Sequence, residues 1–351
     1  MAEAELYVPY LSSCKAEDLA TQVLYGIPLP PSQTNRLCRL AKSLSGKSVS
    51  VMIDSPDQLE CTRHYKAQLG TALQLFIKVD TGYGRAGIKY NSSAFERLAS
   101  AIFELEEEGV VELVGFYSHA GHSYSHETEE ASLQTLIHEM EELERAAGRA
   151  AELLGPGHAP RKLTLSIGAT PTTTSIQSFL SNPKATSEDV RKHLKYLSET
   201  AIPRIQEHHT LELHAGNYCF NDMQQLATQA SPSAASPSSS PTALSLSDIA
   251  MTVLAEVVST YPDREPPEAL IAGGTLALGR EPAPNYSGWG VVSDWGMPKL
   301  PESGLKPMHS GWQVGGISQE HGKLTIDAKA HEDASGGRRH ELKVGQKWIV
   351  D

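Results

Sequence analysis

The sequence predicts an α/β protein: a (β/α)8 TIM-like barrel without its first two strands, followed by a C-terminal, mainly antiparallel β domain. Strand-like and helix-like segments alternate over residues 1–228, which is typical of parallel strands joined by crossover helices. Beyond residue 248 the long helical patterns stop. Short apolar runs separated by turn residues follow, and these indicate antiparallel strands.

The bulk composition is that of an ordinary globular protein, with 351 residues, 40% of them hydrophobic and 21% charged. A net charge of -12 argues against a nucleic-acid partner, because phosphate binding needs a basic face. No stretch reaches the roughly 18 uninterrupted apolar residues of a membrane span, and the acidic N-terminal segment lacks the pattern of an export signal. The four scattered cysteines (Cys14, Cys38, Cys61 and Cys219) predict reduced thiols in a cytoplasmic protein.

Six strands are expected in the first part of the chain. They lie at 23–25, 48–53, 73–79, 112–118, 163–167 and 210–214. Helical patterns separate them, as in the segment where Phe95, Leu98, Ile102 and Leu105 fall on one face and Gly109 ends the helix. Further helices are predicted from Pro56 to Leu69, around Leu136 up to Gly155, and around Leu194.

Each of these strands ends in polar or glycine-containing sequence. In chain order the ends read YGIP, IDSP, DTGYGR, SHAGHSY, GATPT and HAGNY. A doubly wound sheet places its ligand at one switch point, so only one or two strand ends need such residues. In a barrel every strand end faces the active site. Six such ends therefore favour the barrel, and a count of six rather than eight predicts two missing strands.

The chain is predicted to have three parts. Residues 1–228 form the partial barrel, and residues 229–247 form a Ser/Pro-rich flexible insertion. Residues 248–351 form the β domain, whose strand-like runs include EALIAGGTLALG, WQVGGISQEHGKLTI and VGQKWIV.

The segment KVDTGYGRAGI (78–88) is the most specific motif. Its glycines suit a tight turn at a strand end, and Arg85 is placed to meet an anionic or phenolic oxygen. An ordinary strand–turn–helix connection with a surface arginine is the alternative. The loops GATPT (168–172) and AGNY (215–218) offer hydroxyls and backbone N–H groups that can bind phosphate. If two strands precede the first one, these loops follow strands seven and eight, where barrels commonly hold phosphate.

Three histidines, His119, His122 and His126, lie close together in SHAGHSYSH. A metal site is disfavoured because the segment is predicted to be a loop and contains no HExxH pattern. Active-site polar contacts from His119 and Tyr124 are the preferred interpretation. His321, in SQEHG, is either a turn residue or a site residue contributed by the β domain, and we favour the site.

Taken together, these segments resemble the D-serine dehydratase and D-threonine aldolase group of enzymes. The matching stretches are YGIPLPPS, KVDTGYGRAGI, GFYSHAGHSYS, IGATPT, HAGNY and SQEHG. The group consists of fold-type III pyridoxal-phosphate (PLP) enzymes related to alanine racemases, and its eukaryotic dehydratases also hold zinc. The resemblance implies that Arg85 contacts the PLP ring oxygen. It places Thr170, Gly216, Asn217 and Tyr218 near the phosphate or ring, and His119 and Tyr124 in the pocket wall.

Two features of the group are expected to be absent. The group carries its cofactor lysine on the first strand, and its second strand ends in a stretch like AEAE, whereas this chain opens at MAEAE. Its zinc ligands, a His-x-Cys pair, follow a stretch like VGQKWIV, after which this chain stops at Asp351. The sequence thus predicts a chain truncated at both ends, with no metal ligands. Lys78 matches a supporting lysine of the alanine racemases rather than the cofactor lysine.

The resemblance implies a PLP-dependent lyase acting on small D-amino acids, one that converts D-serine to pyruvate and ammonia. Two alternatives stay open: a D-threonine aldolase-type lyase, and an inactive remnant. The group also implies a homodimer. A barrel that lacks two strands would expose sheet edges, which favours aggregation or pairing with a partner.

Overall fold

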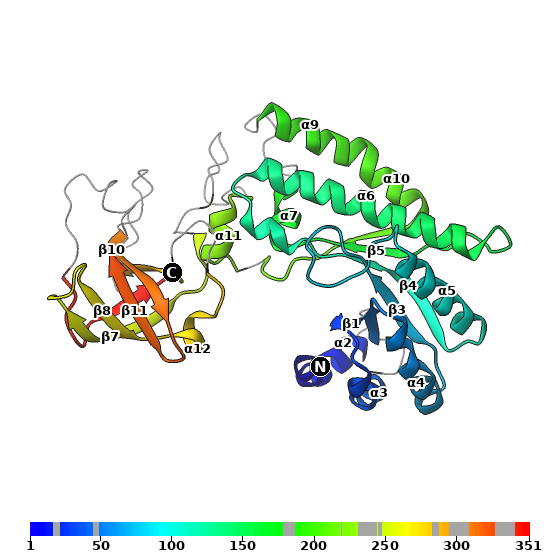
Figure 1. The fold of residues 1–351 in the computed structure, drawn as a ribbon, viewed down its shortest axis with the longest axis horizontal. Coiled ribbons are helices and arrows are strands. Elements are labelled where there is room, and N and C mark those ends of the chain that lie inside the picture. Colours follow the sequence, from blue (N-terminus) through cyan, green and yellow to red (C-terminus); the bar gives the residue numbers. More distant parts are fainter. Residues whose placement is uncertain are drawn as a thin grey trace. The chain divides into compact units, whose positions relative to one another are not determined.

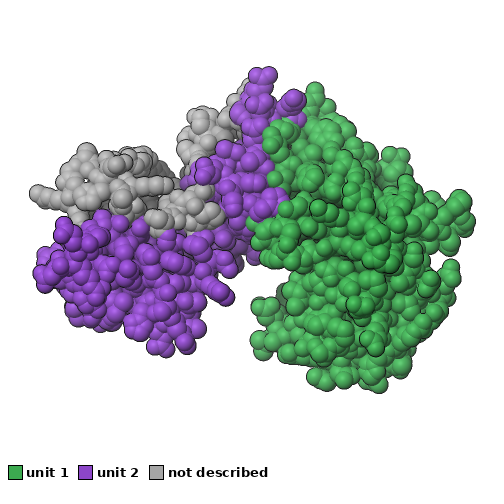
Figure 2. Space-filling model, viewed as in Figure 1, with its two compact units in different colours: residues 1–121, 134–169, 193–214 green, residues 122–133, 170–192, 215–351 purple. Residues whose placement is uncertain are grey.

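A computed structural model describes most of the chain. The described residues are 1–16, 22–44, 49–177, 187–218, 220–230, 244, 248–282, 288–294, 309–326 and 341–351. They form two compact units (Figure 2). Unit 1 comprises residues 1–121, 134–169 and 193–214, and unit 2 comprises residues 122–133, 170–192 and 215–351. Most of the predicted insertion at 229–247 lies outside the described residues.

Unit 1 is built on a sheet of six parallel strands in chain order, as the alternating sequence pattern predicted. The strands are β1 (Val23–Pro28), β2 (Val49–Ile53), β3 (Leu73–Lys78), β4 (Val111–Tyr117), β5 (Thr164–Ile167) and β6 (Thr210–Leu213). All six predicted strands are confirmed. The carboxyl ends of parallel strands lie at one edge of a sheet, so the polar segments after them are brought to the same side.

Two helices, α1 (Ala2–Leu6) and α2 (Val8–Ala16), precede β1. The crossovers between the strands contain α3 (Thr34–Ser43), α4 (Thr62–Leu69), α5 (Ser93–Glu107), α6 (Glu129–Leu154), α9 (Glu188–Tyr196) and α10 (Ile202–His208), with the 3-10 helices η1 (Pro31–Gln33) and η2 (Pro56–Cys61) and the π-helical segment η4 (Leu197–Ala201). Helix α4 contacts β3, α10 contacts β6, and α5 contacts β4, beside which it lies in Figure 1. The predicted apolar face of α5 is buried, Ser92 caps its start, and Gly109 follows it at φ 68°.

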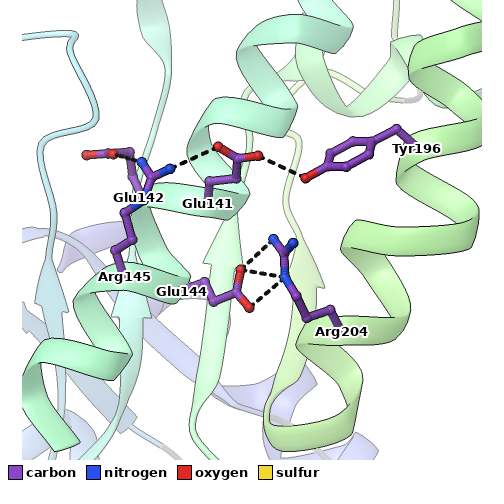
Figure 3. Close-up of polar contacts among 6 residues, drawn as sticks. All are labelled: Glu141, Glu142, Glu144, Arg145, Tyr196 and Arg204. Carbon is purple, nitrogen blue, oxygen red and sulfur yellow. Dashed lines mark hydrogen bonds and ion pairs between the residues drawn. The ribbon is translucent and has the colours of Figure 1, made fainter. Parts of the chain in front are cut away.

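An ion pair and a hydrogen bond join α6 to the α9–α10 segment (Figure 3). The guanidinium of Arg204 donates from Nε and Nη2 to the carboxylate of Glu144, at 2.7–3.0 Å. The Tyr196 hydroxyl donates to Glu141 Oε1 at 3.0 Å. Arg145 pairs with Glu141 and with Glu142 along α6 itself. These contacts fasten the last crossover helix of unit 1 to α6, which also contributes a side chain to the candidate site.

Unit 2 contains a closed barrel of six antiparallel strands, so the predicted β domain is confirmed. The strands are β7 (Val253–Tyr261), β8 (Glu268–Ala272), β9 (Val291–Asp294), β10 (His309–Ile317), β11 (His321–Ile326) and β12 (Lys347–Val350), arranged in the order β10-β11-β8-β7-β12-β9. Its core includes Val257, Ile271, Trp312, Leu324 and Trp348. Closure leaves the described barrel without a free strand edge.

Two local predictions are wrong. The run EALIAGGTLALG is not one strand, because the chain turns after β8 and forms the short helix α12 (Thr275–Leu278). A side chain at Gly274 would collide with the backbone around Ser318, and the Thr275 N–H donates to the Ser318 carbonyl at 2.8 Å. The histidine-rich segment is not simply a loop, since residues Gly121–Ser125 form the 3-10 helix η3.

Unit 2 also holds two short helices from the barrel part of the sequence, α7 (Thr170–Ser175) and α11 (Met223–Thr228). Asp222 caps α11 by accepting from the Gln225 N–H at 2.9 Å. Within the described ranges, no helix has the length and hydropathy that crossing a bilayer requires.

Candidate functional site

The candidate site lies in unit 1, where the carboxyl ends of β3, β4, β5 and β6 bring polar side chains together. Its residues are Lys78 at the end of β3 with Tyr83 and Arg85 after it, Tyr117 at the end of β4 with Ser118 and His119 after it, Ser166 in β5 with Gly168 after it, and Glu212 in β6 with His214 after it. The predicted strand-end segments supply Tyr83, Arg85, Ser118, His119, Gly168 and His214. The other four residues come from the strands themselves.

Two carboxylates shape the turn after β3. Asp80 Oδ1 accepts from the backbone N–H groups of Gly82 and Gly84 at 3.1 and 3.0 Å. Asp54, after the neighbouring strand β2, accepts from the Gly87 N–H at 3.0 Å. Gly87 has φ 110°, and a Cβ there would collide with the backbone of Val79 and Asp80. The glycines of the motif therefore allow a turn that returns tightly onto its own strand.

Lys78 ends β3 as a buried lysine with 6% of its surface exposed. Its Nζ lies 4.5 Å from the centre of the Tyr117 ring, which is the geometry of a cation–π contact. Burial, followed by the nearby charge of Arg85, lowers the pKa of Lys78 to about 8. A substantial minority of the amine is therefore neutral just above neutral pH.

Arg85 is exposed, and its guanidinium carbon lies 4.9 Å from the centre of the Tyr83 ring. Its charge nevertheless acts on the site, because it helps to lower the pKa of Lys78 and opposes the rise that burial causes in the pKa of Tyr117. The alternative of a surface arginine in an ordinary strand–turn–helix connection also agrees with this exposure and stays open. Contact with a cofactor oxygen stays a prediction.

Two stacked aromatic rings, from the ends of β4 and β6, lie at the centre of the cluster. The rings of Tyr117 and His214 are nearly parallel, 7° apart, with centroids separated by 4.4 Å. The His119 ring lies 6.1 Å from that of His214 and 6.3 Å from that of Tyr83. Burial raises the pKa of Tyr117 to about 12, so its phenol stays protonated. Burial, followed by His119, lowers the pKa of His214 to about 4, so its imidazole is neutral at pH 7.

His214 is tied to the strand beside it. Its Nδ1 lies 3.1 Å from the Ser166 hydroxyl, and that hydroxyl donates to Glu212 Oε1 at 2.6 Å. Serine and glutamate thus fix the ring plane of His214 from two adjacent strands. None of these three residues was selected from the sequence. The only available signal was that the HAGNY motif itself begins with a histidine.

His119 contacts the loop after β5, where the carbonyl oxygen of Gly168 lies 3.0 Å from its Nδ1. A carbonyl oxygen can only accept, so Nδ1 carries a proton. In the neutral ring, Nε2 is then the nitrogen with a lone pair. This orientation agrees with the predicted pocket role of His119, and no contact with a ligand tests that role.

Beneath the site lies Glu139 of α6, which is fully buried. The Ser118 hydroxyl donates to its Oε1 at 2.6 Å. Burial raises the pKa of Glu139 to about 7, although Ser118, the backbone of Ala120 and Gly168, and Lys78 act in the opposite direction. The sequence did carry a signal for this residue, since Glu139 is a single carboxylate within the apolar stripe formed by Leu136, Met140 and Leu143.

The predicted phosphate residues lie in unit 2. The backbone N–H of Asn217 donates to Thr170 Oγ1 at 3.0 Å, so the loops after β5 and β6 contact each other there. The Asn217 side chain donates to Asp222 at 2.7 Å. Gly216 has open space where a Cβ would be, and Tyr218 is exposed. Phosphate binding by these residues stays a prediction.

The remaining predicted residues are also in unit 2. Tyr124 is half-buried in η3, and His321 is exposed at the start of β11, beside the hairpin turn from β10. The His122 and His126 rings meet edge to face at 6.0 Å. In the described part of the chain, no group of three or more His, Cys, Asp or Glu side chains is arranged to hold a metal ion.

Family models match both parts of the chain. The model described as "Alanine racemase, N-terminal domain" matches residues 32–177, and "Putative serine dehydratase domain" matches residues 250–350. Among solved structures, D-threo-3-hydroxyaspartate dehydratase from Delftia sp. HT23 aligns with a TM-score of 0.58 and 22% identity, covering 93% of this chain and 70% of that one. An alanine racemase-like protein from Idiomarina loihiensis aligns with a TM-score of 0.60 and 22% identity, covering 97% and 72%. These structures confirm the fold.

Curated relatives share more of the sequence. The D-serine dehydratase of Schizosaccharomyces pombe is 34% identical over 329 residues, which are 92% of this chain and 65% of that protein. This chain therefore spans just under two thirds of that relative's length. The D-serine dehydratase of Saccharomyces cerevisiae is 32% identical over 355 residues, which cover all of this chain and 72% of that protein. The chain belongs to the D-serine dehydratase family.

Proposed function

We propose that this protein is a PLP-dependent D-serine ammonia-lyase, which converts D-serine to pyruvate and ammonia. The observation that carries the proposal is the cluster at the ends of β3 to β6, where Lys78 and Arg85 supply positive charge beside the flat stack of Tyr117 and His214. PLP is an anion with a planar ring, and these groups match both properties. The curated relatives named D-serine dehydratase support the same activity.

In this proposal Arg85 and Lys78 bind anionic oxygens and orient the ring against the Tyr117–His214 stack. When bound, PLP supplies an electron sink for the charge that develops at the substrate Cα. Because His214 is neutral, it would add no positive charge beside a bound PLP ring. His119, protonated on Nδ1, can hold or accept a proton at Nε2. The phosphate is assigned to the loops of Thr170, Gly216, Asn217 and Tyr218, and pocket contacts to Tyr124 and His321.

The family's lyases also hold zinc by resemblance, but the described residues do not provide a ligand set for it. A homodimer in the cytoplasm is part of the proposal. The buried, unpaired thiols of Cys38 and Cys61 suit a reducing compartment.

The test is pyruvate formation from D-serine by the full chain supplied with PLP, followed with a coupled lactate dehydrogenase assay. L-serine and D-threonine serve as comparison substrates, and glycine formed from D-threonine would reveal the aldolase alternative. R85M is expected to lower kcat/KM at least about tenfold, because a charge-assisted contact to the cofactor is lost. R97M, which removes an exposed arginine of α5, should leave the rate unchanged.

A measurement of PLP binding distinguishes the remaining alternatives. PLP that binds without pyruvate formation would support the inactive remnant, and no PLP binding would overturn the assigned site. Borohydride treatment followed by peptide mass spectrometry reports whether PLP is attached to a lysine. We expect Lys78 to remain unmodified, in keeping with a supporting role.

A further inference from the structure

Glu139 is the one glutamate among the fully buried polar residues of the described chain, with 0% exposure. It projects from α6 amid Leu136, Met140 and Leu143, which are themselves fully buried. Burying a carboxylate carries a large desolvation cost unless donors compensate it. The proposed function gives Glu139 no role in binding or proton transfer. Its role is therefore inferred from the groups that contact its carboxyl.

The donor that contacts Glu139 comes from the loop after β4, which carries His119. Ser118, which directly precedes His119, donates its hydroxyl to Oε1 at 2.6 Å. The backbone of Ala120, which directly follows His119, and that of Gly168 also oppose the rise in the pKa of Glu139. Oε2 makes no hydrogen bond of ordinary geometry within the described residues.

Gly168, in the loop after β5, also contacts His119. The carbonyl of Gly168 accepts from Nδ1 of His119 at 3.0 Å. Glu139 therefore contacts the residue that directly precedes His119, and Gly168 orients the His119 ring from the loop after β5. A shift of either loop would change the distance between Nδ1 and the Gly168 carbonyl, on which the protonated nitrogen depends.

We propose that Glu139 is a positioning residue: its carboxylate anchors Ser118, and with it the loop after β4, and thereby holds His119 as the Nδ1–H tautomer, with Nε2 as the proton acceptor. The inference rests on the proposed function only for its consequence, that Nε2 faces the reacting groups. The tautomer itself is a property of the chain without cofactor. It can be measured independently of activity.

The experiment is NMR of the full chain with 15N-labelled histidine rings, at a pH where the His119 ring is neutral. The H119N variant assigns the signals. In the wild-type protein Nδ1 should carry the proton. E139Q and E139A should raise the population of the other tautomer roughly fivefold or more, the factor that corresponds to losing one net hydrogen bond. E144Q removes a carboxylate from the same helix, at its ion pair with Arg204, and should leave the His119 signals unchanged.

S118A provides a second route if the Glu139 variants fail to fold, because it removes only the 2.6 Å contact. It should shift the tautomer ratio in the same direction by a smaller factor. Unchanged His119 signals in folded E139Q, E139A or S118A would overturn the inference. So would equal changes in E144Q. PLP binding by the wild-type chain, measured separately by absorbance, tests the proposed function alone, so a failure of either can be recognised.

Discussion

Lys78 combines burial with a charge, and this couples its protonation to folding. Burial, followed by the charge of Arg85, lowers the pKa of Lys78 to about 8 from the ordinary lysine value of 10.5. Between those two values the unfolded chain binds more protons than the folded one. Stability therefore rises with pH over that window, and the contribution is lost as the pH falls toward 8.

The K78M variant should remove this dependence. For the wild-type protein, Lys78 alone should raise the free energy of unfolding by about 2 kcal/mol between about pH 8 and about pH 10. In K78M the free energy of unfolding should be higher at pH 8 and should lack this increase, because an apolar chain of similar volume replaces the buried amine. Urea denaturation of both proteins at the two pH values measures the difference. A rise of the same size in K78M would assign the dependence to other groups.

At the same scale, some site residues could be predicted from the sequence and others could not, for a physical reason. Arg85 and His119 stand in motifs at strand ends, where barrel topology alone brings them together. Tyr117, Ser166 and His214 meet by stacking and hydrogen bonding between different strands. Neither apolar periodicity nor loop composition records such contacts.

At the scale of the element, the strands of unit 1 could be predicted because each is a short apolar run bounded by turn residues. β2 shows this most clearly, since all five of its residues are buried. The prediction failed at α12, where apolar residues follow two glycines. A tertiary contact between Gly274 and the turn at Ser318 determines the helical turn there, and local sequence does not contain that contact.

The α6–α10 contact supports a prediction about how elements are held. Arg204 and Glu144 form a bidentate pair whose side chains are 40% and 28% exposed, so solvent screening limits its strength (Figure 3). R204M should lower the free energy of unfolding by about 1 kcal/mol. In K195M the loss should stay within a few tenths of a kcal/mol, because Lys195 and Glu199 are 3.8 Å apart and largely exposed.

Urea denaturation gives both values, and a double-mutant cycle of R204M with E144Q isolates the pair itself. A coupling energy near zero, or equal losses in R204M and K195M, would show that the fastening of α10 to α6 comes from apolar packing instead.

At the scale of the whole molecule, the two units differ in whether their described sheets have edge strands. The six strands of unit 2 close into a barrel, whereas the sheet of unit 1 runs from β1 to β6 with no further strand paired to either one in the described residues. Parallel edge strands present unpaired N–H and C=O groups. The division of the chain at 1–228, 229–247 and 248–351 stays a prediction.

The β1 edge predicts concentration-dependent self-association of the full chain. Its register against β2 shifts between Tyr25 and Pro28, and Ile27 within this bulge is 55% exposed. A charge on an edge strand opposes pairing with another strand. I27K should therefore raise the self-dissociation constant roughly tenfold, which corresponds to about 1.4 kcal/mol. V258K places the same charge on an exposed strand position of the closed barrel, 41% exposed in the wild type, and should have little effect. Sedimentation velocity across a wide range of protein concentration decides the matter: a wild-type chain that stays monomeric throughout, or equal shifts in I27K and V258K, would exclude β1 as the contact.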